Sequence, residues 1–277
     1  MDKKDILTKH RYAWQTTYSQ WERSAHDLWR STQSVRSDGG PIVLLVGDSI
    51  ARGYSKESFD FDPNDELSIF KHPDRLLNQL ARQNGSSWRA CFSGLINLDH
   101  TQKAFELALT PGDVVLYQDW GPCAANYATT FHKFAYFASL TAELVENDLV
   151  FLDGFCTAKA DKVFDFNRPC LDSRESPNHA IQAAAEVSNA RFLSVTNRLH
   201  CAEETMGQLF GVSLFEPDGV HPNGFGNLFL AAILLLEMSQ ELPRLEPMNS
   251  LVSELMTELD LDLETEQILT CLQKAIV

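Results

Sequence analysis

The sequence predicts an α/β fold in which a mainly parallel, five-stranded sheet is covered by helices on both faces. Short apolar runs rich in β-branched residues alternate along the chain with longer segments of helical periodicity, and this alternation is typical of parallel strands joined by crossover helices. The chain has 277 residues, of which 44% are hydrophobic, so it is long enough to bury a sizeable core.

The individual elements follow from local patterns. Strands are expected at 42–46, 88–92, 113–117, 149–153 and 191–196. Helices are expected at 75–83, 98–109, 129–147 and 178–189, with 220–227 opening the last core helix. The acidic, turn-rich segment 56–74 predicts a loop. The apolar stretch 228–236 is shorter than the roughly 20 residues of a membrane span, so it predicts a buried helix.

Three regions are expected along the chain. Residues 1–40 form an N-terminal helical extension with aromatic residues at helical spacing, 41–240 form the central α/β domain, and 241–277 form a C-terminal helical tail. The terminal helices have three open roles: they cap the domain, they form a homo-oligomer, or they dock a protein partner.

Composition restricts the partners. The formal net charge of −15 opposes binding to nucleic acid or to an anionic bilayer. The first residues lack the pattern of a signal peptide, which predicts a cytoplasmic protein without a membrane span. The six cysteines are scattered without a Cys-x-x-Cys pair, which favours reduced thiols and no metal site.

Two motifs carry the chemistry. Gly-Asp-Ser at 47–49 directly follows the first predicted strand, so a tight turn would lift the Ser49 hydroxyl above the sheet edge, where α/β folds place reactive groups. Asp218 and His221 lie three residues apart on one turn of chain. The carboxylate can then accept from one imidazole nitrogen while the other faces Ser49, which supplies a nucleophile, a base and a group that orients the base.

These blocks resemble the first and last blocks of the SGNH/GDSL hydrolases, over about residues 41–240. The resemblance implies a three-layer α/β/α, flavodoxin-like domain with its site at the carboxyl ends of the strands. It also implies an esterase or acyl hydrolase with a catalytic triad of Ser49, Asp218 and His221 and with no cofactor.

The family's oxyanion donors are the serine amide, a glycine and an asparagine, and the first two match Ser49 and Gly94. The family's Gly-x-Asn-Asp block is expected after the third strand, but no asparagine occupies that position here. Three alternatives are open: a protonated Asp119, the amide of Gln118, or Asn126 from the following loop; Gln118 is favoured. Losing one donor costs about 2.7–4 kcal/mol of transition-state stabilisation.

The sequence therefore predicts a serine hydrolase that cleaves a carboxylic ester or thioester through an acyl-enzyme on Ser49. Its substrate would be a small-molecule or glycan ester. One alternative is an acyltransferase that passes the acyl group to an alcohol such as a sugar hydroxyl. Because the asparagine is missing, a second alternative is a catalytically degenerate protein that binds a ligand or assembles with a partner.

Overall fold

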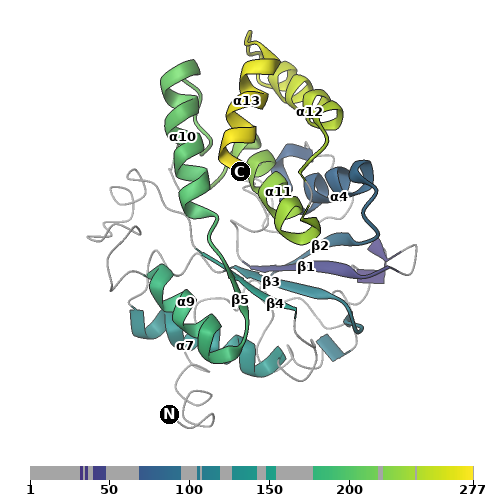
Figure 1. Cartoon of the computed structure of the whole chain (residues 1–277), viewed down its shortest axis with the longest axis vertical. Coiled ribbons are helices and arrows are strands. Elements are labelled where there is room, and N and C mark those ends of the chain that lie inside the picture. Colours follow the sequence, from purple (N-terminus) through teal and green to yellow (C-terminus); the bar gives the residue numbers. More distant parts are fainter. Residues whose placement is uncertain are drawn as a thin grey trace.

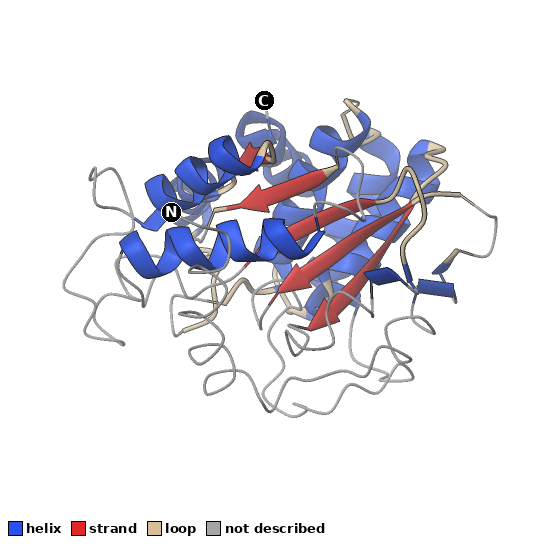
Figure 2. Ribbon diagram, turned by 90° about the horizontal axis from the view of Figure 1, so that it is seen from below, coloured by secondary structure: helices blue, strands red, loops and turns tan. Residues whose placement is uncertain are grey.

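The protein contains a five-stranded sheet in the order β2-β1-β3-β4-β5, and every pairing is parallel (Figures 1 and 2). This is the strand order of flavodoxin-like folds, so the expected fold class is confirmed. The strands are β1 (Ile42–Gly47), β2 (Arg89–Gly94), β3 (Val114–Gln118), β4 (Leu149–Leu152) and β5 (Arg191–Leu193). The computed structural model describes residues 32–33, 35–36, 40–47, 69–94, 105–106, 108–118, 127–141, 148–153, 177–217, 221–240 and 242–276.

Helices cover both faces of the sheet, as Figure 1 shows. The helices on one face are α4 (Pro73–Asn84), α10 (Thr196–Phe210), α11 (Gly224–Ser239), α12 (Leu245–Glu258) and α13 (Thr265–Ile276). The helices on the other face are α7 (Tyr127–Thr141) and α9 (Pro177–Ser188). All six residues of β1 are buried, because a strand in the middle of a parallel sheet is covered on both sides.

Helix α11 is the centre of the larger core. Its residues 225–235 are all buried, which confirms the predicted buried helix. Helices α12 and α13 add Leu251, Leu255 and Leu272 to the same hydrophobic cluster. The C-terminal helices therefore pack against the α/β domain. None of the helices in the described part of the chain has the length and hydropathy that a membrane-spanning helix needs.

Two local predictions were wrong. Helix α4 begins at Pro73, and the short 3-10 helix η2 (Ile69–Lys71) precedes it, so the predicted loop 56–74 ends earlier than expected. Proline fits the first turn of a helix because it has no N–H to leave unpaired. The strand expected at 191–196 stops at Leu193, and α10 follows it. The spacing of the buried residues Leu199 and Met206 was the helical signal that the prediction overlooked.

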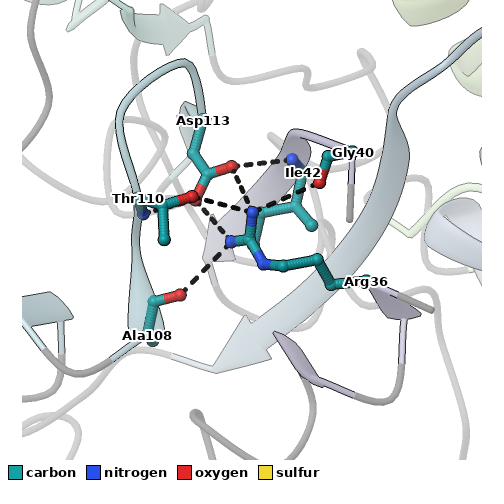
Figure 3. Close-up of polar contacts among 6 residues, drawn as sticks. All are labelled: Arg36, Gly40, Ile42, Ala108, Thr110 and Asp113. Atoms are coloured by element: carbon teal, nitrogen blue, oxygen red, sulfur yellow. Dashed lines mark hydrogen bonds and ion pairs between the residues drawn. The ribbon is translucent and has the colours of Figure 1, made fainter. Parts of the chain in front are cut away.

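A buried ion pair joins two distant segments at the amino edge of the sheet (Figure 3). The Asp113 carboxylate accepts from Arg36 Nη1 at 3.0 Å, from the Ile42 N–H at 2.8 Å and from the Thr110 N–H at 2.7 Å. Arg36 also donates to the Gly40 C=O. The side chain of Asp113 is 0% exposed and that of Arg36 is 10% exposed. These bonds attach the segment before β1 to the turn before β3.

Candidate active site

The first two parallel pairings of the sheet bring three site positions side by side. Gly47 at the end of β1 lies opposite Gly94 of β2 on one side and opposite Gln118 of β3 on the other. Neighbouring strands lie about 4.8 Å apart, so the three backbones meet at the carboxyl edge. Ser49 follows two residues after Gly47 in the sequence. The predicted site residues outside the described part of the chain are Ser49, Asp119, Asn126 and Asp218.

Gln118 is buried at this edge, and its amide has no partner in the described part of the chain. The residue is 1% exposed, and neither Oε1 nor Nε2 has a hydrogen-bond partner among the described residues. Strand alternation places Gln118 on the same face as Leu116, which belongs to the core beneath α11. A buried polar group without a partner costs about 1–3 kcal/mol, so this amide is available to donate to a ligand oxygen.

The backbone next to Gln118 is held by an aromatic cluster on the opposite face. The ring of Tyr117 stacks on Phe137 with centroids 3.8 Å apart, and its contact with Phe134 is edge-on at 4.7 Å. Tyr117 is 0% exposed. The packing of Tyr117 on one face of the sheet fixes the position of the strand backbone. Because successive side chains point to opposite faces, Gln118 then faces the other core at a defined position.

His221 lies at the neck of a short loop that precedes α11. The Glu216 N–H donates to the His221 C=O at 2.8 Å, and Phe215 forms an isolated antiparallel bridge with Pro222. These contacts close the loop at residues 216 and 221, which form its neck. In the sequence, Asp218 lies between these two positions. His221 is half-buried.

The start of α11 contacts the segment that begins α4. The Asn227 side chain donates from Nδ2 to the Phe70 C=O at 2.9 Å. A Cβ at Gly224 would lie 3.3 Å from the Cβ of Phe70. Phe70 belongs to η2, which immediately precedes α4. The loop of His221 is thus attached to the amino end of α4.

The amino end of α4 in turn contacts the carboxyl end of β2. Asp74 in the first turn accepts from the Phe92 N–H at 3.3 Å, two residues before Gly94. Burial raises the pKa of the Asp74 carboxyl above its ordinary value of 3.8, against the lowering effect of the Arg75 N–H and charge and of the Phe92 N–H. His221, Gly94 and Gln118 therefore belong to one edge of the sheet. Asp74 was not among the predicted site residues, because the sequence pattern placed it in the loop 56–74 and started the helix at residue 75.

The carboxyl ends of the last two strands are joined by a second buried acid. Asp153 accepts from the Ser194 hydroxyl at 2.6 Å and from the Val195 N–H at 2.8 Å, and it is 1% exposed. These bonds make Asp153 a structural connection between β4 and β5. Within the described ranges, no group of three or more His, Cys, Asp and Glu side chains is arranged to hold a metal ion.

The sheet order and the helical layers define a flavodoxin-like α/β/α protein. Solved structures of similar fold include the following two. A lipase/acylhydrolase from Enterococcus faecalis matches with a TM-score of 0.53 and 16% identity, covering 74% of this chain and 98% of that chain. LAE5, an alpha/beta hydrolase enzyme from the metagenome of Lake Arreo, Spain, matches with a TM-score of 0.50 and 14% identity, covering 73% of this chain and 95% of that chain.

At these identities the likeness shows the fold, and the fold expected from the resemblance to SGNH/GDSL hydrolases is confirmed. No protein-family model matches the sequence, and no curated protein matches it.

Proposed function

We propose that the protein is a serine hydrolase that cleaves a carboxylic ester or thioester through an acyl-enzyme on Ser49. The observation that carries this proposal is the register that sets Gly47 between Gly94 and Gln118 at the carboxyl edge. The lipase/acylhydrolase and the alpha/beta hydrolase of similar fold support the same reaction class.

In the first half-reaction, the Ser49 hydroxyl oxygen attacks the carbonyl carbon while His221 accepts the hydroxyl proton. Asp218 accepts a hydrogen bond from the other imidazole nitrogen and stabilises the imidazolium. The carbonyl oxygen becomes an oxyanion that accepts from the backbone N–H groups of Ser49 and Gly94 and from the Gln118 amide. The imidazolium then protonates the leaving alcohol or thiol, and the acyl group stays on Ser49.

In the second half-reaction, a water molecule gives its proton to His221 and attacks the acyl carbon. The second oxyanion accepts from the same donors. Its collapse breaks the bond to Ser49, which regains a proton from the imidazolium, and the carboxylic acid is released.

Gln118 is the third donor in this mechanism because its amide is neutral, buried and unpartnered among the described residues. An ionised Asp119 beside a forming oxyanion would raise the energy of the transition state. An amide N–H at this position instead stabilises the charge without a change of protonation state.

The test is serine-directed labelling by a fluorophosphonate together with hydrolysis of p-nitrophenyl acetate. The parent protein is expected to react with both. Ser49→Ala is expected to lose both activities, whereas Ser253→Ala is expected to keep them, because Ser253 is an exposed residue of α12. Hydrolysis by Ser49→Ala at the parent's rate would exclude an acyl-enzyme on Ser49.

A further inference from the structure

Asn223 makes two kinds of side-chain hydrogen bond at once. Its Oδ1 accepts from the Gly226 N–H at 3.1 Å, which caps the amino end of α11. Its Nδ2 donates to the Ser213 C=O at 2.6 Å and to the Phe215 C=O at 3.4 Å. Its backbone N–H donates to the Leu214 C=O at 2.9 Å. One residue therefore ties the start of α11 to the other side of the loop that contains His221.

A residue of α10, Glu203, also bonds the segment that precedes this loop. The half-buried Glu203 carboxylate accepts from the Ser213 hydroxyl at 2.9 Å through Oε1 and from the Leu214 N–H through Oε2. Hydrogen bonds to an ionised acceptor are about twice as strong as neutral ones. Residues 213–215 are thus fixed between Asn223 on one side and Glu203 on the other.

The first turn of α11 lies in close contact with residues 213–215. A Cβ at Gly226 would lie 2.1 Å from the Leu214 carbonyl oxygen and 2.8 Å from the Pro222 Cβ. The close approach explains the glycine at this position, and it lets the Asn223 amide reach the carbonyl groups across the neck of the loop.

Helix capping alone does not require asparagine here. Serine, threonine and aspartate accept the same N–H hydrogen bond and cap a helix about as well. Only asparagine adds a donor pair beside the accepting oxygen. Asn223 uses this donor on two carbonyl groups, those of Ser213 and Phe215, and helix capping does not require these bonds.

We propose that Asn223 is a positioning residue for His221: its amide holds the neck of the loop, braced by Glu203, so that the imidazole keeps one placement at the carboxyl edge. This inference rests on the proposed function, in which His221 is the base. A displacement of about 1 Å at a reacting group costs roughly 100-fold in rate.

The discriminating variant is Asn223→Ser, which keeps the helix cap and loses the Nδ2 amide donor that reaches the two loop carbonyl groups. With p-nitrophenyl acetate, kcat is expected to fall by about 10- to 100-fold while KM changes by less than about twofold, because a misplaced base slows the chemical steps and leaves the binding of the ester unchanged. Retention of the parent's kcat by this variant would overturn the proposal.

Asn84→Ser is the matched control. Asn84 also donates to a carbonyl group, that of Leu242 at 3.0 Å, and accepts from a backbone N–H, that of Arg244 at 3.1 Å. It lies at the carboxyl end of α4, toward the amino edge of the sheet. This variant is expected to lose stability and keep the parent's kcat.

Hydrogen exchange tests the inference without catalysis. In Asn223→Ser the backbone amides of Glu216 and of residue 223, which bond across the neck, are expected to exchange about tenfold faster than in the parent, while amides in the middle of α11 stay protected. Unchanged exchange at the neck overturns the inference even if activity falls. An inactive parent with faster exchange at the neck in the variant contradicts the proposed function and still shows that the Asn223 amide holds the loop. If Asn223→Ser does not fold, Glu203→Gln tests the same loop from α10, with the same expected fall in kcat.

Discussion

The side-chain amide of Asn78 bonds both backbone groups of Ala90: Oδ1 accepts from the N–H, and Nδ2 donates to the C=O. Strand β2 is at the edge of the sheet, and exposed edges promote association with other chains. One turn earlier on α4, Asp74 accepts from the Phe92 N–H. Two side chains of a helix thus occupy the places of a missing neighbouring strand.

Asn78→Ala is expected to lower the free energy of unfolding by about 1–3 kcal/mol, because it leaves two backbone groups of Ala90 without their partner. Urea denaturation measures the loss. Arg82→Ala, at an exposed position on the same helix, is the control and is expected to change stability by less than about 0.5 kcal/mol. Equal effects from the two variants would contradict a specific role for the edge bonds.

The raised pKa of Asp74 predicts a dependence of stability on pH. The folded protein holds the Asp74 proton at pH values where the unfolded chain has already lost it. The contribution of this group to stability is therefore complete below pH 3.8 and is lost as the pH rises through the folded-state pKa. Asp74→Asn is expected to be more stable than the parent at neutral pH, with the advantage shrinking toward acid. Urea unfolding between about pH 4 and pH 8 tests this, and a pH-independent difference contradicts it.

The buried ion pair at the amino edge is expected to matter for stability and not for catalysis. Asp113→Ala removes the partner of Arg36 and should lower the free energy of unfolding by about 3–5 kcal/mol. Glu237→Ala breaks the more exposed pair with Arg198, at 2.9 Å, and should cost about 1 kcal/mol or less. Comparable losses in the two variants would contradict the role of burial.

Gln118→Met separates catalysis from stability. Methionine has a similar volume and removes an amide that bonds none of the described residues, so the melting temperature is expected to stay level or rise. The value of kcat for p-nitrophenyl acetate should fall by about 10²- to 10³-fold through loss of an oxyanion donor. Asp119→Asn and Asn126→Ala are the comparison variants. If one of them loses kcat while Gln118→Met does not, the third donor is not Gln118.

Gly226→Ala is expected to lower both the melting temperature and kcat, because the added methyl group meets the Leu214 carbonyl oxygen. Gly207→Ala is the matched control, since a Cβ there has no atom within 4 Å among its neighbours. In the last turn of α10 this change should raise the free energy of unfolding by up to about 0.5–1 kcal/mol. Thermal unfolding of both variants distinguishes crowding at the loop from a general effect of glycine replacement.

Much of the fold was predictable because its signals are local. The strands begin within one residue of their predicted starts, since continuous apolar runs between turns indicate buried parallel strands. The position of Gln118 at the end of β3 was predictable for the same reason. Helix α10 was missed because polar residues separate its buried positions, so its short apolar stripe was overlooked.

The bonds that hold the loop of His221 were not predictable in this way. Asn223 follows the histidine motif in the sequence, but its carbonyl partners lie eight and ten residues earlier. Glu203 comes from a different helix and bonds a segment ten residues away. Neither hydrophobic periodicity nor a sequence motif predicts which carbonyl groups a particular side-chain amide will bond.

The amino-acid sequence by itself determined where strands and helices form and which residue types stand at strand ends, because hydrophobic periodicity and turn chemistry act over a few residues. Tertiary structure alone decided that Gly47 lies between Gly94 and Gln118, that Asn78 covers the edge of β2, and that Asn223 spans the neck of a loop. Such contacts depend on packing between segments that are distant in the sequence. The packing energy is shared among many residues, so no single residue in the sequence indicates the contact.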